Sequence, residues 1–422
     1  MYDFSRRSFL QATGAVSALT LAGCVTTSSK ARVIVVGGGF GGATAAKYVK
    51  FFDPSVDVTL IEQNKTYTTC PFSNAYLGGL VKFGDITHNF SAMAGHGVKV
   101  VNDMVTGVDP VKKTVTTKGG QSMSYDRLIM SPGIDFRWDT IEGYDAAAAE
   151  LVPHAWKAGP QSQLLRKQLE AMDDGGVVAI APPPNPFRCP PGPYERASLI
   201  AHYLKANKPR SKVLILDAKD KFSKQGLFTE GWKIHYGDMI EWVPAAKDGK
   251  VLGVDAKTRT LKTDFTEHKV AVANVIPAQS ANMLAAKAGL TDKSGWCPIN
   301  LATFESKLHP GVHVIGDAAI ASGMPKSGNA ANTQAKVCAT AVVDMLAGRT
   351  PGTPKTTNTC YSLITSDHGI SVTAVYELGP KKYGGVKGSG GLTPKAAGRE
   401  FWKQESRNAR GWYANIAEDI WG

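Results

Sequence analysis

The residues of this chain most able to carry redox or covalent chemistry are its six cysteines. They are too few for a disulfide-stabilised scaffold, since such scaffolds are short and dense in cysteine. A cysteine in a large chain can instead be a packing residue, a reactive thiol or half of a redox pair, and its surroundings decide which. The six are Cys24, Cys70, Cys189, Cys297, Cys338 and Cys360.

Cys189 lies in a proline-rich segment that interrupts a strand–helix pattern. Residues 175–181 have the composition of a buried strand, and a helix over 194–205 and a strand over 212–216 are expected to follow it. Residues 182–193, between the first strand and the helix, contain seven prolines. Proline has no backbone N–H, so this loop cannot form a phosphate cradle, and we do not expect NAD(P)H as the reductant. The segment either fixes Cys189 in place or is a surface linker.

A glycine motif near the start of the chain indicates dinucleotide binding. Gly37, Gly39 and Gly42 have the G-x-G-x-x-G spacing and follow a buried-strand pattern over 31–36. A helix to residue 52 and a strand over 56–61 follow, and Glu62 comes 20 residues after Gly42. Gly37 would make the tight turn, Gly39 would admit the pyrophosphate and Gly42 would let the helix pack on the strand. Glu62 would accept hydrogen bonds from ribose hydroxyls.

Two later segments resemble motifs of flavoproteins that have two dinucleotide domains. Residues 311–316 form a strand pattern that ends at Asp317, and a long helix is expected over 327–346. In those flavoproteins the matching aspartate binds the ribityl chain of FAD, although Asp317 could otherwise cap a helix. Pro132 and Gly133 lie in a small-residue crossover after the strand over 125–130. These motifs, in this order, imply FAD.

The length of 422 residues predicts two or three domains. With 20% charged and 43% hydrophobic residues, the chain has a globular and not a disordered composition. The fold class expected is α/β, with two Rossmann-like domains as in glutathione reductase and a C-terminal interface domain. The expected boundaries are 30–145 and 269–350 for the two parts of the FAD domain, 146–268 for the second Rossmann-like domain and 351–422 for the interface domain.

Residues 1–29 are predicted to be an export signal. Arg6 and Arg7 precede a short, weakly apolar run, which is typical of twin-arginine signals and implies a periplasmic protein; a frayed helix is the alternative. Leu21 to Cys24 also resembles a bacterial lipobox, so the signal ends either in lipidation of Cys24 or in simple cleavage further on. Loss of residues 1–23 removes two arginines and one aspartate and lowers the net charge from +12 to +11. This charge suits an anionic substrate or an acidic partner, and nucleic acid is not expected.

Four segments resemble the flavoprotein subunit of flavocytochrome c sulfide dehydrogenase. They are residues 65–74, 187–196, 324–328 and 358–362, and the second is the most specific. The resemblance implies that Cys70 is bonded through sulfur to the flavin 8α carbon and that Cys189 and Cys360 form a redox-active disulfide. It also implies that Glu195 is an acid/base. Without the resemblance, a structural bridge would be the more ordinary interpretation of the pair. Arg188 would favour a thiolate at Cys189.

The same resemblance implies a reaction. Sulfide would attack the disulfide, two electrons would pass to FAD, and reduced FAD would pass them singly to a c-type cytochrome. The sequence contains no Cys-x-x-Cys-His, so the haem would lie on another polypeptide. The rival functions are a sulfide:quinone oxidoreductase, which shares the fold, and a non-catalytic protein that keeps only the flavin fold.

The C-terminal residues present an amphipathic helix. Trp412, Ile416 and Ile420 recur at every fourth position, so one helix face is apolar. That face either packs on the protein's own core or meets a cytochrome or membrane surface. Cys297 and Cys338 are interpreted as core residues, and a role near the flavin is the alternative for Cys297. The nine histidines show no metal-binding spacing, so no metal site is expected, and no stretch after the signal is long and apolar enough to span a membrane.

Overall fold

The glycine motif folds as a strand, a turn and a helix. In the computed structural model, which describes residues 30–422, β1 (Arg32–Val36) leads through the turn into α1 (Gly42–Phe52), and β2 (Asp57–Ile61) returns beside β1. The expected signal over 1–29 and Cys24 lie outside the described residues. β1 and β2 are the centre of a parallel sheet with the order β19-β9-β1-β2-β5. The other strands are β5 (Val98–Val101), β9 (Arg127–Met130) and β19 (Val312–Val314).

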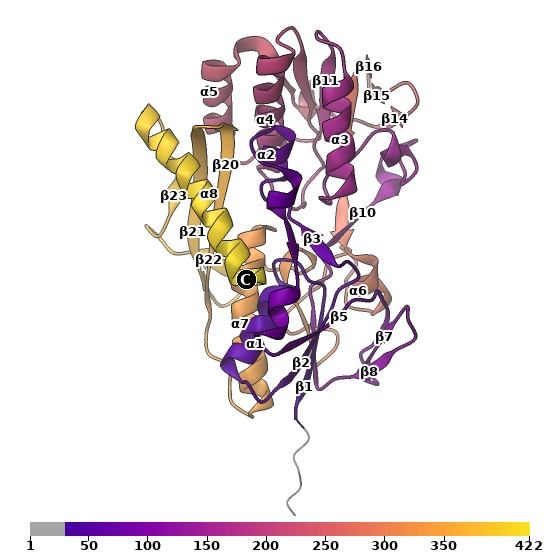
Figure 1. Ribbon diagram of the computed structural model, residues 1–422, viewed down its shortest axis with the longest axis vertical. Coiled ribbons are helices and arrows are strands. Elements are labelled where there is room, and N and C mark those ends of the chain that lie inside the picture. The colour runs from indigo at the N-terminus through magenta and orange to yellow at the C-terminus, as the bar shows by residue number, and fades with distance from the viewer. Residues whose placement is uncertain (1–29) are drawn as a thin grey trace, which may run out of the picture. The chain divides into compact units, whose positions relative to one another are not determined.

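The C-terminal part of the chain returns to complete this first sheet. β19 pairs with β9, and α7 (Gly328–Leu346), the helix expected over 327–346, packs beside α1 (Figure 1). Cys338 on α7 and Cys297 are fully buried in the apolar core formed with this sheet, which confirms both as packing residues. Small side chains on the two helices, such as Ala43, Ala46 and Ala335, allow the close approach.

A second parallel sheet has the order β13-β12-β11-β17. β11 (Val177–Ala181), α4 (Gly192–Asn207) and β12 (Lys212–Leu216) lie close to where the sequence places them, and α3 (Pro160–Ala171), α5 (Gln225–His235) and β13 (Ile240–Val243) complete the unit. β17 (Val272–Val275) pairs with β11, so the expected boundary at residue 268 is wrong. The reason is that this short, fully buried strand fills the free edge of β11 before the chain leaves the sheet.

The two sheets of the Rossmann type confirm the expected α/β class. Between them, β10 (Ile134–Phe136) pairs with β18 (Gln279–Ala281), so the two chain crossings run side by side. The remaining elements are β3 (Thr66–Thr68), α2 (Ser73–Leu77), β4 (Thr87–Asn89), β6 (Val105–Asp109), β7 (Thr114–Thr117), β8 (Ser122–Ser124), β14 (Gly253–Asp255), β15 (Thr260–Lys262), β16 (Glu267–Lys269) and α6 (Met283–Lys287).

The C-terminal segment is a β-sheet covered by one long helix. β20 (Lys355–Thr365) and β21 (His368–Leu378) form a hairpin, β22 (Tyr383–Gly385) and β23 (Gly391–Leu392) pair with β21, and α8 (Arg399–Trp421) lies along the hairpin (Figure 1). Ile416 and Ile420 are buried in the main core, with Trp412 packed against it. The apolar face of this helix therefore packs on the protein itself and is not a docking surface. Among residues 30–422, no helix has the length and apolarity to cross a membrane.

Candidate active site: a cysteine pocket joined to a dinucleotide groove

A groove opens at the carboxyl ends of the strands of the first sheet. It is lined by the predicted cofactor residues Gly37, Gly39, Glu62, Cys70, Pro132 and Gly133, together with Tyr67 and Arg188. Gly37 has φ +97°, and a Cβ there would lie 2.4 Å from the backbone oxygen of Ser131. A Cβ on Gly42 would lie 1.8 Å from the oxygen of Gly37, so the turn and the start of α1 can approach only because both residues are glycine.

Glu62 is fixed at the end of β2. Its Oε2 accepts a hydrogen bond from the Gly38 backbone N–H at 2.7 Å, and its Oε1 accepts one from the Asn64 backbone N–H at 2.9 Å. Oε1 also accepts from Nδ2 of Asn64 at 3.1 Å, so about one of the four acceptor sites of the carboxylate, on Oε2, is left for a hydroxyl in the groove. This arrangement is compatible with the ribose-binding role of Glu62, which stays a prediction.

Asp317 lies in a short 3-10 turn (Gly316–Ala318) after β19 and carries an acceptor without a partner. Its Oδ1 is buried and has no hydrogen-bond donor among the described residues, and its Oδ2 lies 3.7 Å from Nη1 of Arg188. The Nε of Arg188 is likewise buried and without an acceptor in that part of the chain. An unpaired buried polar atom is costly, so these two groups indicate a polar ligand between the groove and the cavity beyond it.

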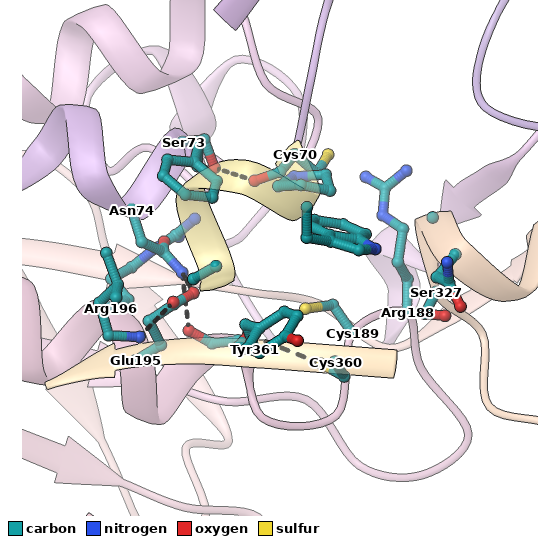
Figure 2. A pocket seen from close by; sticks show the side chains of 18 of the residues that line it. Cys70, Ser73, Asn74, Arg188, Cys189, Glu195, Arg196, Ser327, Cys360 and Tyr361 are labelled. Carbon is teal, nitrogen blue, oxygen red and sulfur yellow. Dashed lines mark hydrogen bonds between the residues drawn. The ribbon is translucent and has the colours of Figure 1, made fainter. Parts of the chain in front are cut away.

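The cavity beyond the groove is lined by three of the six cysteines. Cys70 and Arg188 line both the groove and the cavity, so the two are continuous. In Figure 2, Cys70 lies above the pocket and Cys189 and Cys360 lie below it. The other lining side chains are largely apolar or aromatic and include Phe72, Trp156, Tyr361, Leu363 and Trp412. The indole N–H groups of Trp156 and Trp412 are buried without an acceptor among the described residues.

These features fit a flavin dinucleotide. A flavin ring has an apolar edge and a polar edge of carbonyl and ring nitrogen atoms, which the apolar walls and the unpaired N–H donors of Trp156, Trp412 and Arg188 would match. The adenosine and pyrophosphate would lie along the glycine turn and Glu62. Cys70, which is half-buried where the two spaces meet, is the thiol placed to reach the ring.

The proline-rich loop holds Cys189 at the floor of the cavity. Its backbone N–H donates to the oxygen of Lys326 at 2.8 Å, its oxygen accepts from the Gly192 N–H at 2.8 Å, and its φ of +57° is unusual for a residue with a side chain. The loop is therefore a positioning device and not a surface linker. Cys360 reaches the same cavity from β20. Both thiols are free in this structure, so the residues meet as expected but their disulfide stays a prediction.

Burial controls the protonation of the two thiols. It raises the pKa of Cys189 well above its usual value, with Cys360 and Glu195 adding to the effect, and it also raises the pKa of Cys360. Arg188 interacts with Cys189 electrostatically, as expected, but burial outweighs this interaction and keeps the pKa of Cys189 raised. Arg188 also pairs with Asp317 and donates to the oxygen of Trp156. The cation that lowers the pKa of both thiols is Lys224.

Glu195, the expected acid/base, faces the pocket from the first turn of α4. Its Oε2 accepts from Nδ2 of Asn74 at 2.8 Å, and its Oε1 accepts from the backbone N–H of Leu363 at 2.8 Å (Figure 2). Burial raises the pKa of Glu195, whereas these two donors, followed by Lys224 and Arg196, oppose the rise. The carboxylate is thus poised between a desolvated site that favours the acid and donors that favour the base.

Asn74 is oriented by a fully buried arginine. Nε of Arg196 donates to Oδ1 of Asn74 at 3.0 Å, and because arginine can only donate, the amide NH₂ of Asn74 must face Glu195. The other donors of Arg196 bond to the oxygens of His154 and Ala155 and to Oδ1 of Asn274. Asn74, Arg196 and Lys224 were not predicted from the sequence. Asn74 lies four residues after Cys70 and Arg196 one residue after Glu195, so their closeness to predicted site residues was the available signal.

The corresponding place in the second Rossmann-like unit is filled by side chains. Asp217, at the end of β12, is fully buried and accepts from the Tyr194 hydroxyl at 2.6 Å, the Trp242 indole at 3.0 Å and Nζ of Lys219 at 2.6 Å. The ring of Phe222 stacks on Tyr194 with 3.7 Å between centroids. A ribose-binding acid needs free acceptor atoms that face a groove, whereas the carboxylate oxygens of Asp217 accept hydrogen bonds from buried side chains.

The fold and the site define a flavoprotein with two dinucleotide domains, of the pyridine nucleotide–disulphide oxidoreductase class. The sequence model of that class matches residues 31–170. The model described as the central domain of the sulfide dehydrogenase (flavocytochrome c) flavoprotein chain matches residues 162–277, and the one described as the flavin-binding domain of flavocytochrome c sulphide dehydrogenase matches residues 352–421. The chain belongs to the family of flavocytochrome c sulfide dehydrogenase flavoprotein chains.

The known relatives include a sulfide dehydrogenase flavoprotein chain and several sulfide:quinone oxidoreductases. The flavoprotein chain of sulfide dehydrogenase from Chlorobaculum thiosulfatiphilum is 64% identical over 44 residues, which cover 92% of that sequence and 10% of this chain. The mitochondrial sulfide:quinone oxidoreductase of Mus musculus is 22% identical over 340 residues, covering 74% of this chain and 70% of the relative. The structure of the sulfide:quinone oxidoreductase from Aquifex aeolicus has the same fold, with a TM-score of 0.69, 16% identity and coverage of 93% and 92%.

Proposed function

We propose that this protein oxidises sulfide and passes the electrons, through the Cys189–Cys360 pair and a bound FAD, to a c-type cytochrome. One observation carries the proposal. Two cysteines 171 residues apart and the carboxylate of Glu195 meet in one cavity, and that cavity is continuous with the dinucleotide groove. A protein that kept only the flavin fold would have no need to hold two thiols and a buried acid together, so a non-catalytic role is disfavoured.

The residues of the pocket divide the first chemical step between them. HS⁻ attacks one sulfur of the oxidised pair, the new S–S bond replaces the old one, and the second cysteine leaves as a thiolate, so charge and electrons balance. Glu195, held by Asn74 and Leu363, accepts the S–H proton of the persulfide that forms. When bound, FAD supplies an acceptor that takes two electrons and can return them one at a time. The apolar walls exclude water from the persulfide.

Cys70 is proposed to be the covalent tether of the flavin. Its sulfur lies at the junction of groove and cavity, and Thr69, beside it, is held by hydrogen bonds to the Pro71 oxygen at 2.8 Å and to the Tyr413 hydroxyl at 2.9 Å. The segment before α2 is therefore rigid. A fixed thiol at this point suits a permanent bond to the ring edge better than a role in electron exchange with sulfide.

A cytochrome is the proposed acceptor, and a quinone is the alternative. The match to the flavocytochrome models over residues 162–277 and 352–421 supports the cytochrome. The longer matches to sulfide:quinone oxidoreductases support the quinone. The 422 residues contain no Cys-x-x-Cys-His, so the haem would be supplied by another polypeptide. We further propose that the twin arginines Arg6 and Arg7 direct export to the periplasm, where Cys24 would become a lipid anchor if it is the cleavage site.

Anaerobic reduction of the purified flavoprotein tests the proposal. Sulfide should bleach the flavin absorbance within seconds of mixing, and NADH should leave it unchanged. Cytochrome c that is added after sulfide should then become reduced. Reduction of a short-chain ubiquinone analogue with no reduction of cytochrome c would make the protein a quinone reductase. Rapid bleaching by NADH would refute the argument from the proline-rich loop, and an unchanged flavin spectrum in sulfide would refute sulfide as the donor.

A further inference from the structure

Lys224 places a buried positive charge beside the cysteine pair. It stands at the start of α5 with only 6% of its surface exposed and with φ of +60°. Its Nζ donates to the backbone oxygen of Cys360 at 3.0 Å and to Oγ of Ser362 at 2.8 Å. A lysine that is buried on a strained backbone is costly to keep, which indicates that its position is used.

The charge of Lys224 is not neutralised by an ion pair. Within residues 30–422, no carboxylate lies within ion-pair distance of its ammonium group, whereas Lys219, the neighbouring buried lysine, pairs with Asp217 at 2.6 Å. The field of Lys224 therefore acts on the groups around it. These groups include the thiols of Cys360 and Cys189, because Lys224 lowers the pKa of each against the effect of burial.

Two other cations, Arg188 and Arg196, interact electrostatically with Cys189, and both already have partners of their own. Arg188 pairs with Asp317, and Arg196 donates hydrogen bonds to Asn74, Asn274 and two backbone oxygens. Two further groups face the thiols, namely Glu195 from α4 and Cys70 from the segment before α2, and neither brings a positive charge. Lys224 is left as the cation for a negative charge that forms on Cys360.

We propose that Lys224 is a positioning residue that stabilises the thiolate of Cys360 as the pair is opened, against the burial that favours the neutral thiol. This role rests on the proposed function, since a pair that is opened by HS⁻ must release one sulfur as an anion. Lys224 would act through its bond to the Cys360 oxygen, which fixes the ammonium at a constant distance from that residue. The hydroxyl of Ser362 holds the second N–H and prevents the side chain from turning away.

The pH dependence of thiol alkylation tests this role without sulfide or cytochrome. The flavoprotein is reduced anaerobically with a phosphine, treated with iodoacetamide across a pH series, and the alkylation of Cys360 is followed by peptide mass spectrometry. In Lys224→Met the alkylation midpoint should move up by about one pH unit, which slows the reaction roughly tenfold at neutral pH. Lys224→Arg, which keeps the charge, should stay near the wild type.

Lys219→Met is the matched control, because it removes a buried lysine that is paired with Asp217 and should leave the midpoint for Cys360 in place. An unchanged midpoint in Lys224→Met, or an equal shift in Lys219→Met, would overturn the role. If Lys224→Met does not fold, Lys224→Gln gives the same comparison with a neutral donor. Since the readout uses no sulfide, a protein that fails to oxidise sulfide but shows the shift would sink the proposed function and not the role of Lys224.

Discussion

The two Rossmann-like units share a topology and use it for opposite purposes. Each places a parallel strand, a loop, a helix and a second strand in the same order, and each second strand is followed by an acidic residue, Glu62 after β2 and Asp217 after β12. In the first unit the loop is glycine, its backbone turns sharply, and Glu62 faces a groove. In the second unit the loop is proline-rich, and Asp217 is buried against Tyr194, Trp242 and Lys219.

The difference shows that the loop after the first strand decides what such a unit does. Glycines expose backbone N–H groups to phosphate, whereas prolines remove them and fix the direction of the chain. The second unit has exchanged a phosphate site for a rigid support, and the residue it supports is Cys189. If this contrast is right, changes in the second unit should affect sulfur chemistry alone, and changes in the first should affect retention of the cofactor.

Cys189→Ser should show the largest effect. Sulfide-dependent bleaching of the flavin should slow by roughly a thousandfold or more, because a hydroxyl cannot replace the sulfur in a disulfide exchange. The flavin content, measured from absorbance per protein, should stay as in the wild type. Cys338→Ser, in the core on α7, is the control and should retain sulfide oxidation. Rapid bleaching in Cys189→Ser would mean that the second unit supports something other than the sulfur chemistry.

Cys70→Ala should separate the retention of the cofactor from the sulfur chemistry. After acid denaturation, the flavin fluorescence should stay with the wild-type polypeptide and should appear in the free fraction of Cys70→Ala, because the proposed tether would survive unfolding and the groove would not. Cys297→Ala, another buried cysteine of the first unit, should keep the flavin on the chain. Free flavin from the acid-denatured wild type would show that the groove alone holds the cofactor.

The fold could be predicted from the sequence because its signals are local. A pattern of a dozen residues or fewer is enough to predict the glycine turn, each buried strand and the proline-rich loop. The observed bounds of β1, β11 and β12 lie within one or two residues of the predicted ones. The predicted domain boundary at residue 268 is wrong because β17 is a strand of four residues. Such a strand is too short for its composition to show which sheet it joins.

The site was predicted less completely because its contacts are long-range. The meeting of Cys189 with Cys360 came from resemblance to a family and not from spacing. Lys224 lies in a lysine-rich stretch, residues 219–224, that has the composition of an exposed loop, and only the fold brings it to the oxygen of Cys360. Arg188 was placed beside Cys189 by sequence adjacency, yet its side chain turns to Asp317, which is 129 residues away.

Asn74 joins the two units, and it tests whether they are independent. It lies on α2, four residues after Cys70, and donates to Glu195 on α4 of the second unit. Asn74→Leu removes a donor that favours the carboxylate, so the pKa of Glu195, already raised by burial, should rise further by about one unit. Because the base form is then populated only at higher pH, the acidic limb of the pH profile of sulfide oxidation should move up by a similar amount.

The control for this smaller effect is Asn332→Leu, which removes a buried amide from α7 that bonds to Thr44 and Asp419. It should lower stability and leave the pH profile in place. The ionisation of sulfide is common to all variants and cancels in the comparison. A profile that does not move in Asn74→Leu would mean that Glu195 is not the base, and that the unit holding the cofactor does not tune the unit holding the sulfur chemistry. A shift in Asn74→Leu alone would show that α2, which follows Cys70, also sets the proton affinity of Glu195.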